Sequence, residues 1–253
     1  MSEAPARAAH KIVVDEIYKS FPTDAGVLEV VGGISFSVAA GQTVAIVGPS
    51  GCGKSTLLGI LAGFNPADRG GVLIDGVPRR RADRKGIVIS QQGSVFPWLS
   101  VQENIAFGLN TGTHAERLAI AARFTELVGL KGFERQYPHE LSGGMLKRVE
   151  LARAFAVKPE ILYMDEPFSA LDALMSLRMR NELLQLLREQ EQTLVLITHD
   201  VEEAIHLADR ILVLSPRPAT IKCSIDVDLA HPRKLTSPEA QSLKEQVLSE
   251  LGL

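Results

Sequence analysis

Nine consecutive residues combine glycines, a lysine and hydroxyl groups in a spacing suited to holding a phosphate. They fit the pattern GxxxxGK[ST], with Gly48, Gly53, Lys54 and Ser55 at its fixed positions. Glycines let such a loop fold tightly around an anion, and backbone N–H groups at a helix start point toward the charge. Lys54 is expected to reach the β- and γ-phosphates, and the Ser55 hydroxyl to coordinate Mg²⁺. The expected nucleotide-binding residues here are Gly48, Pro49, Ser50, Gly51, Cys52, Gly53, Lys54, Ser55 and Thr56.

The surroundings of this loop are those that the motif requires. Residues 43–47 form an apolar, β-branched run, and residues 57–61 repeat apolar side chains at helical spacing. A glycine-rich turn that arose by chance is the alternative, and the order of strand, loop and helix disfavours it. The loop therefore predicts a bound nucleotide.

Two adjacent acids, Asp165 and Glu166, follow the apolar run 161–164. At the carboxyl end of a strand, Asp165 is expected to hold Mg²⁺ and Glu166 to polarise the attacking water. Such a general base accelerates a reaction by roughly 10²- to 10⁴-fold. A plain helix-start signal is the alternative for two acids in this position, and the phosphate loop favours the catalytic interpretation.

Two other segments place polar groups where a phosphate could be contacted. His199 follows the apolar residues 194–197 at another expected strand end, from which it could contact the γ-phosphate and orient water. Ser142, Gly143 and Gly144 open a helix with a serine cap, which is a second backbone site suited to an anion. Alone, this second segment would be only a turn before a helix.

Short buried strands alternating with helices make up most of the chain. Runs that are apolar on both faces imply a parallel sheet covered on both sides. These runs are residues 44–47, 72–74, 87–90, 161–164, 194–198 and 211–214. Residues 12–14 and 27–38 are typical of strands in an antiparallel layer that precedes this α/β core.

The strand signal vanishes between residues 91 and 156, where the spacing is helical. The expected helices are residues 101–109, 114–128 and 142–156. The sequence thus predicts a single domain over residues 10–235, with a helical subdomain inserted at about 92–156, and a C-terminal helix within 236–253.

Composition excludes several classes of protein. The formal net charge of -3 over 253 residues argues against nucleic acid as the main partner, which usually requires a basic surface. Cys52 and Cys223 have no zinc spacing, and a disulfide at Cys52 would disturb the phosphate loop, so a reducing, cytosolic compartment fits. Without an apolar run of about 18 residues or an apolar leader at the N-terminus, we expect neither a membrane span nor export.

The order of the chemical segments resembles that of the ATP-binding cassette (ABC) ATPases over about residues 10–220. The shared elements are the phosphate loop, Gln91, residues 141–144, residues 165–167, residues 169–172 and His199. The resemblance implies a P-loop NTPase (RecA-like) fold with ATP and Mg²⁺ as cofactors. It also implies a head-to-tail dimer, of two copies or of this chain with a homologous cassette. Each ATP then lies between one subunit's phosphate loop and the other's signature segment, residues 142–145.

Four signature and communication residues take their roles from this resemblance. Ser142, Gly143 and Gly144 are expected to bind the γ-phosphate across the dimer interface, and Asp172 to connect the two sites. Met145 stands where the commonest signature has glutamine. A methionine side chain does not support the polar contact expected of that glutamine, but the backbone anion site remains.

Gln91 and Phe21 also take their roles from the resemblance. Gln91 stands six positions before Pro97, which selects it over Gln92 as the glutamine that senses Mg²⁺ and the attacking water. Phe21 is expected to stack on adenine in preference to Tyr18, with an ordinary strand-end phenylalanine as the alternative.

Within the family, the chain resembles the nitrate, sulfonate and taurine importers. The features that carry this likeness are residues 96–98, Met145, residues 165–172 and residues 215–218. The likeness implies an ATPase subunit that powers import of a small anionic solute through transmembrane permease subunits, with an extracytoplasmic solute-binding protein as an indirect partner. Such a subunit is peripheral, on the cytoplasmic face of the inner membrane.

The permease is expected to dock on residues 91–98 and the helical insertion. Phe96 and Trp98 could face that partner or be buried in the chain's own core. Competing functions are the ATPase of a lipid transporter or exporter, a soluble ABC ATPase, and a nucleotide switch without turnover. Soluble members usually carry a long coiled coil or two cassettes, and this sequence shows neither feature. An intact Glu166 and His199 argue against a switch.

Overall fold

The computed structural model describes residues 10–24, 26–91 and 93–253, and the chain forms two compact units. The first unit contains the residues up to 83 together with 193–253, and the second contains residues 84–192. The N-terminal residues 1–9, Ala25 and Gln92 lie outside the described residues. The proposed helical insertion falls within the second unit.

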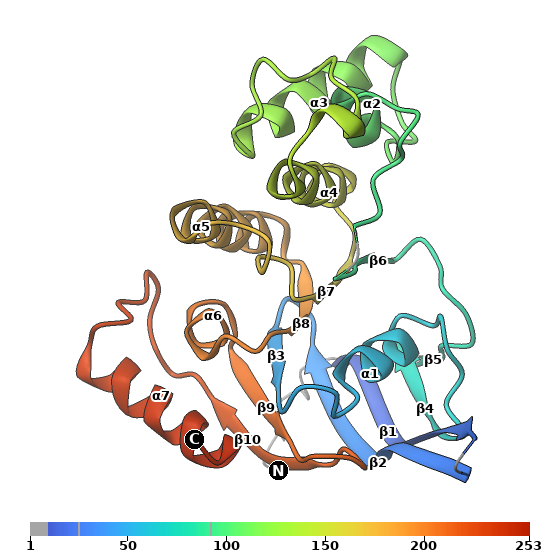
Figure 1. Ribbon diagram of the computed structural model, residues 1–253, viewed down its shortest axis with the longest axis vertical. Coiled ribbons are helices and arrows are strands. Elements are labelled where there is room, and N and C mark those ends of the chain that lie inside the picture. The colour runs from blue at the N-terminus through green and yellow to red at the C-terminus, as the bar shows by residue number, and fades with distance from the viewer. Residues whose placement is uncertain (1–9, 25, 92) are drawn as a thin grey trace, which may run out of the picture. The chain divides into compact units, whose positions relative to one another are not determined.

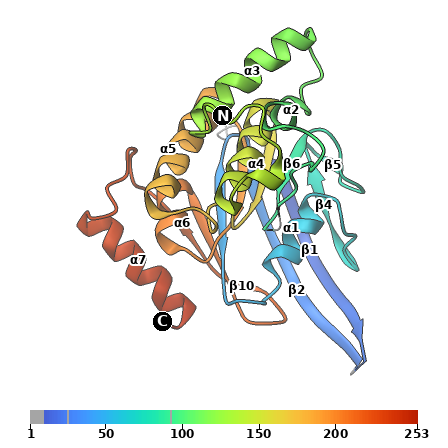
Figure 2. The ribbon, with the colours of Figure 1, turned by 45° about the horizontal axis from the view of Figure 1, so that its top comes forward.

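An antiparallel sheet forms one layer of the first unit. Its long hairpin consists of β1 (His10–Thr23) and β2 (Gly26–Ala39), which are the extended blue strands of Figure 2. On the other side of β1 lies β4 (Arg69–Ile74), followed by the short β5 (Val77–Pro78). The predicted N-terminal antiparallel layer is confirmed.

The place of residues 72–74 differs from the prediction. We expected them in the parallel sheet, and the structure instead pairs them antiparallel with β1, where Val72 lies opposite Val14. Gly70 permits this pairing, because its φ of +81° favours glycine and a side chain there would collide with the backbone of Asp15 and Glu16. The apolar run identified a strand correctly, but pairing direction depends on a distant part of the chain.

The parallel strands of the first unit include the strand that leads into the phosphate loop. The central strand β3 (Thr43–Val47) lies between β8 (Thr193–Ile197) and β9 (Arg210–Leu214), and both pairings are parallel. All residues of β3 and β8 are buried, as expected for strands covered on both faces. At the edge, β10 (Ile221–Asp226) adds an antiparallel strand that the sequence did not predict.

Three helices cover these strands (Figure 1). They are α1 (Lys54–Leu61), α6 (Val201–Leu207) and α7 (Pro238–Leu251). The Ser237 hydroxyl caps α7 by accepting from the backbone N–H of Ala240 at 3.3 Å, and Gly252 ends the helix in the left-handed conformation. Local caps therefore place α7 where the sequence predicted it.

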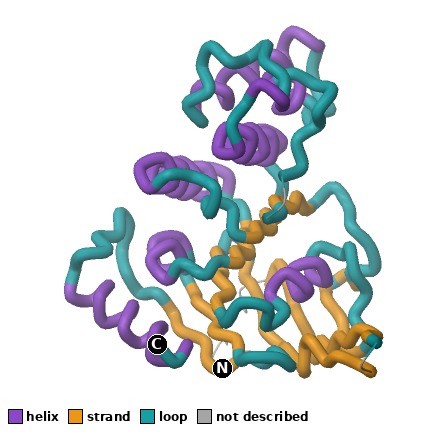
Figure 3. The backbone as a smooth tube through the Cα atoms, in the orientation of Figure 1, coloured by secondary structure: helices purple, strands orange, loops and turns teal. Residues whose placement is uncertain are grey.

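The second unit combines a parallel strand pair with most of the long helices. β6 (Gly86–Ile89) pairs with β7 (Ile161–Asp165). The helices are α2 (Val101–Ala106), α3 (His114–Leu127), α4 (Gly143–Val157) and α5 (Ala173–Gln190), with a 3₁₀ turn at Pro138–Glu140. In Figure 3, α2, α3 and α4 form the group of helices that pack on one another. Among the described residues, every helix is too short or too polar to span a bilayer.

Candidate nucleotide-binding site

The phosphate loop connects β3 to α1, as the sequence predicted. Gly53 precedes the first helical residue and has a φ of +119°, and a Cβ on it would lie 2.7 Å from Cγ1 of Val30. Glycine is therefore required twice, by backbone conformation and by the close approach of β2. Cys52 is buried in the loop, and its thiol is free. The backbone N–H groups of the first turn of α1 lack partners within the helix, which favours an anion at this end.

Lys54 is buried, with 8% of its surface exposed. Its ammonium donates to the carbonyl oxygens of Gly48 at 2.8 Å and Pro49 at 2.9 Å. These contacts hold the charge inside the curve of the loop rather than in solvent. Ser55 is exposed beside it at the start of α1.

His199 lies at the same edge of the sheet as the start of the phosphate loop. Parallel pairing sets Ile46 opposite Ile197. Gly48 comes two residues after Ile46, and His199 comes two residues after Ile197. The backbone N–H of Thr198 donates to the carbonyl of Ile46 at 3.3 Å, which extends the pairing by one residue. His199 itself is exposed. The structure thus brings these two predicted site elements to one sheet edge.

Phe21 and Tyr18 differ in how accessible their rings are. Phe21 lies near the end of β1 with 38% of its surface exposed, and the ammonium of Lys19 lies 5.3 Å from its ring centroid. The ring of Tyr18 is covered by the guanidinium of Arg69 at 4.1 Å. An aromatic that stacks on a base needs an open face, and Phe21 has the more open one.

Gln91 and Glu166 are brought together in the second unit. The side-chain amide of Gln91 donates to the Glu166 carboxylate at 3.1 Å. Asp165 ends β7 and is 8% exposed, while Glu166 follows with a φ of +48°. A left-handed backbone is unfavourable for a residue with a Cβ, and such strain clusters at functional sites. The turn directs Glu166 away from the buried strand and toward Gln91.

The signature segment forms the N-terminus of α4. The hydroxyl of Ser142 caps the helix by accepting from the backbone N–H of Met145 at 3.3 Å, so its own hydrogen remains able to donate. Gly143 and Gly144 supply first-turn N–H groups that have no partner within the helix. A Cβ on Gly143 would meet nothing within 4 Å, whereas one on Gly144 would lie 3.3 Å from the carbonyl oxygen of Ala170. Met145 is half-buried.

Asp172 has a structural role in this chain. Its carboxylate caps α5 by accepting from the backbone N–H of Met175 at 3.0 Å. Burial lowers the pKa of Arg148, and the charge of Asp172 opposes that shift. A Cβ on Gly144 would lie 3.3 Å from the carbonyl oxygen of Ala170, so the segment that carries Asp172 lies beside the start of α4.

Sequence reasoning missed three charged residues on α4. The apolar side chains of this helix form one stripe, made of Met145, Val149, Ala152 and Ala156. Lys147, Glu150 and Arg153 lie off this stripe and were given no role. The structure leaves only 5% of the Lys147 side chain and 2% of the Glu150 side chain exposed, and joins them in an ion pair of 3.0 Å. The available signal was opposite charge at a spacing of three residues, which places two side chains next to each other on a helix.

Comparison with known proteins identifies the family. The family model described as ABC transporter matches residues 31–169. An uncharacterized ABC transporter ATP-binding protein of Methanocaldococcus jannaschii is 41% identical over 245 residues, which are 95% of this chain and 91% of that protein. The aliphatic sulfonates import ATP-binding protein SsuB of Bacillus subtilis is 40% identical over 92% of this chain and 91% of its own length. This chain therefore belongs to the ABC transporter family of ATP-binding proteins.

Solved structures agree with this assignment. The dimeric ATP-binding cassette MJ0796 in a post-hydrolysis state, bound to ADP and Pi, is similar with a TM-score of 0.78 and 26% sequence identity. The match covers 85% of this chain and 98% of that one. The predictions of an ABC ATPase and of a P-loop α/β fold are confirmed.

Proposed function

We propose that the chain hydrolyses ATP with Glu166 as the general base and Gln91 as the residue that orients it. The hydrogen bond between these side chains, beside the buried Asp165, supports this assignment. Lys54 and the loop N–H groups bind the β- and γ-phosphates, and His199 contacts the γ-phosphate from the adjoining strand end. Phe21 stacks on adenine.

Mg²⁺ fits the donor set of the proposed site. Ser55 offers a hydroxyl, Asp165 a carboxylate and Gln91 an amide oxygen, and Mg²⁺ prefers such oxygen ligands. No group of three or more His, Cys, Asp or Glu side chains within the described ranges could hold a metal ion. Mg²⁺ is typically held by one or two protein ligands together with waters and substrate phosphates, and it would neutralise phosphate charge during hydrolysis.

A second copy, or a homologous cassette, would complete each site. Ser142, Gly143, Gly144 and Met145 of one subunit would face the phosphate loop of the other, with Asp172 near the junction. The open space around Gly143 supports this arrangement, since an anion could approach its N–H group.

The proposed cargo is a small anionic solute of the alkanesulfonate class. The observation that carries this proposal is the near full-length match to several proteins named for aliphatic sulfonate import, including one of Bacillus thuringiensis that is 39% identical over 94% of this chain. Such a subunit would work at the cytoplasmic face of the inner membrane, bound to permease subunits that receive solute from an external binding protein.

Solute-stimulated hydrolysis tests this proposal. The chain would be purified from membranes of its own host with its permease and placed in lipid nanodiscs. We expect ATP hydrolysis to rise when the cognate binding protein carries an alkanesulfonate, and to rise less with sulfate or nitrate. Stimulation by a lipid, or by no anion, would contradict the assigned cargo while leaving the ATPase assignment in place.

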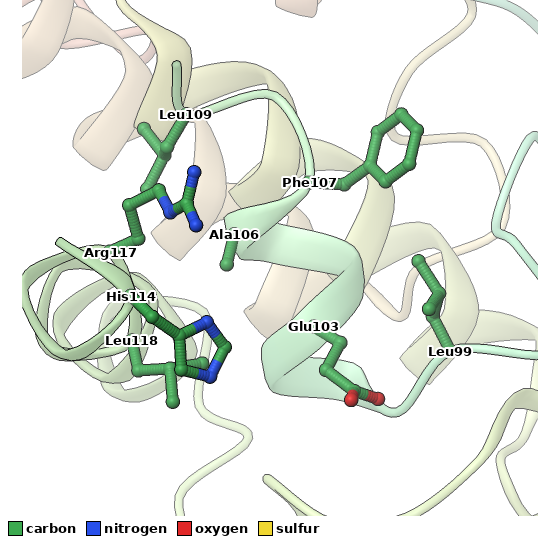
Figure 4. Close-up of a pocket in the computed structure, with 8 residues that line it drawn as sticks. All are labelled: Leu99, Glu103, Ala106, Phe107, Leu109, His114, Arg117 and Leu118. Atoms are coloured by element: carbon green, nitrogen blue, oxygen red, sulfur yellow. The ribbon is translucent and has the colours of Figure 1, made fainter. Parts of the chain in front are cut away.

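An aromatic cluster in the second unit is the proposed permease contact. Trp98 is 69% exposed and Phe107 is 59% exposed. The ring of Phe96 lies between them, 5.5 Å from that of Trp98 and 4.4 Å from that of Phe107. Phe107 also lines a pocket of about 230 Å³ together with His114 and Arg117 of α3, and Figure 4 shows the residues around it. Exposed aromatic groups next to a pocket suit a helix of a partner protein.

Replacing Trp98 with alanine is expected to weaken assembly with the permease. A buried interface tryptophan commonly contributes about 2 kcal/mol or more to binding, which corresponds to a roughly 30-fold change in affinity. Co-purification with the permease would measure the loss, with ATP binding unchanged. Phe64→Ala is the matched control, because Phe64 is 61% exposed but belongs to the first unit. Intact assembly and transport in Trp98→Ala would refute the contact.

A further inference from the structure

Three charged residues of α4 face the chain segment that carries Gln91. Lys147, Glu150 and Arg153 follow one another at intervals of three, which sets them along one row of the helix surface. The row begins within two turns of the signature segment at the start of the same helix. Two of the three side chains are almost completely buried, although charged residues are rarely buried unless they are paired.

Every ionic atom of the buried pair has a partner. The Lys147 ammonium lies 3.0 Å from Oε2 of Glu150 and donates to the carbonyl oxygen of Ser90 at 2.6 Å. The other carboxylate oxygen of Glu150 accepts from the Ser94 hydroxyl at 2.7 Å. One ion pair on α4 thereby holds the backbone immediately before Gln91 and a side chain three residues after it.

Arg153 adds a second contact to Ser94. Its guanidinium donates to the Ser94 hydroxyl oxygen at 2.6 Å and lies 4.8 Å from the centroid of the Phe96 ring. Burial lowers the pKa of Arg153, and the charge of Glu150 opposes this shift. The attraction of this cation to the ring face of Phe96 and to the carboxylate of Glu150 compensates for part of the hydration free energy that burial removes.

We infer that Lys147, Glu150 and Arg153 are positioning residues that hold Gln91 against Glu166 by fixing both sides of its segment to the signature helix. The inference rests on the proposed roles of Gln91 and Glu166 in hydrolysis. Gln91 is itself exposed, so its own packing does little to fix the 3.1 Å hydrogen bond to Glu166. The anchors at Ser90 and Ser94 supply that constraint. A small displacement of a group that orients a catalytic residue is enough to slow a reaction.

Ser94→Ala is the most direct test, because it removes the hydroxyl that Glu150 and Arg153 hold and keeps the ion pair between Lys147 and Glu150. We expect kcat for ATP hydrolysis to fall roughly tenfold while KM for ATP stays the same, since the loop that binds phosphate is untouched. Ser94→Thr retains a hydroxyl and should restore kcat. Thr125→Val is the matched control: the Thr125 hydroxyl is buried in the same unit and donates to the carbonyl of Ala121 at 2.8 Å, far along the chain from Gln91.

A double substitution separates positioning from general destabilisation. In a Gln91→Ala background, Ser94→Ala should cause no further loss of kcat, because the residue that it positions is already gone. A second and equal loss in that background would overturn the inference, as would an unchanged kcat in Ser94→Ala alone. If Gln91→Ala itself left turnover unchanged, the proposed role of Gln91 would fail, and the inference would fail with it.

To test the ion pair between Lys147 and Glu150, a variant must not leave one of the two charges buried without its partner. Removing one partner of a buried pair is strongly destabilising, whereas replacing both with apolar residues of similar size is often tolerated. Lys147→Met combined with Glu150→Leu should therefore fold and should lower kcat as Ser94→Ala does. A folded double variant with normal kcat would contradict a positioning role for the pair.

Trp98 offers a measurement that does not depend on activity. It is the single tryptophan of the chain, and its ring lies against Phe96 in the same segment. Steady-state fluorescence anisotropy of Trp98 should decrease in Ser94→Ala and stay unchanged in Thr125→Val. Unchanged anisotropy in Ser94→Ala would show that the segment is held without this anchor, and the inference would be wrong.

Discussion

Replacing Glu166 with glutamine is expected to lower kcat for ATP hydrolysis by roughly 10²- to 10⁴-fold. Glutamine keeps the size of the side chain and an oxygen that can accept from Gln91, which now donates to Glu166 at 3.1 Å. What it loses is the ability to take a proton from the attacking water. ATP affinity should be unchanged, because the phosphate loop lies elsewhere in the chain. An ATP-held dimer should accumulate, and size-exclusion chromatography with single-turnover kinetics would measure both effects.

Glu160→Gln is the matched control for this experiment. Glu160 precedes β7 as Glu166 follows it, and its carboxylate lies 3.9 Å from the ammonium of Lys85 at the surface. A surface pair of this kind contributes about 1 kcal/mol or less to stability. Turnover by Glu160→Gln should therefore be normal. Near-normal turnover by Glu166→Gln would remove Glu166 from the role of base.

Local sequence signals predicted those parts of the fold that local contacts determine. Helix α7 is one case, because its apolar residues repeat at helical spacing, and the residues that cap it, Ser237 and Gly252, directly flank it. Strand β4 is the opposite case. Its apolar residues predicted a strand, but the residues of β1 with which it pairs antiparallel are more than fifty positions away, so the local pattern could not show the pairing. The edge strand β10 is partly exposed and lacks a continuous apolar run, so it carried too weak a signal.

In the candidate site too, features set by neighbouring residues could be predicted, and features set by distant residues could not. The phosphate loop could be identified from nine residues, since its glycines and lysine act within one turn of chain. The contact between Gln91 and Glu166 joins positions 75 residues apart, and only the family resemblance suggested that these side chains act together. The buried pair on α4 escaped notice because burial depends on what covers a helix, which a single helix's pattern does not show. Opposite charges three residues apart usually lie in solvent.

Removing the ammonium of Lys54 is expected to weaken ATP binding by roughly 10- to 100-fold. Charge-assisted hydrogen bonds contribute about 1.5–3 kcal/mol each, and every 1.4 kcal/mol is a tenfold change in affinity. In Lys54→Ala the carbonyl oxygens of Gly48 and Pro49 would also lose their donor, so the loop itself should be less ordered. Isothermal titration would measure the change in Kd. Lys131→Ala removes an exposed ammonium that pairs with Glu126 at 2.7 Å, and it should bind ATP normally.

Thermal stability separates the loss of affinity from a loss of folding. ATP stabilises a protein that binds it only when folded, so it should raise the Tm of the unaltered chain more than that of Lys54→Ala. Equal shifts would remove Lys54 from the binding site. A lower Tm without nucleotide but an equal shift with it would assign Lys54 a purely structural role.

Mixing Lys54→Ala with Gly143→Asp tests whether each site draws on two subunits. A Cβ on Gly143 meets nothing within 4 Å, so the fold should accept aspartate there, while its charge would repel a phosphate. In a mixed dimer both defects fall on one composite site, and the other site combines an unaltered phosphate loop with an unaltered signature segment. Binding of ATP in the dimer should therefore recover at that second site on mixing, although it is weakened in each variant alone. No recovery in a mixture that demonstrably exchanges subunits would mean that each site takes its phosphate loop and its signature segment from the same chain.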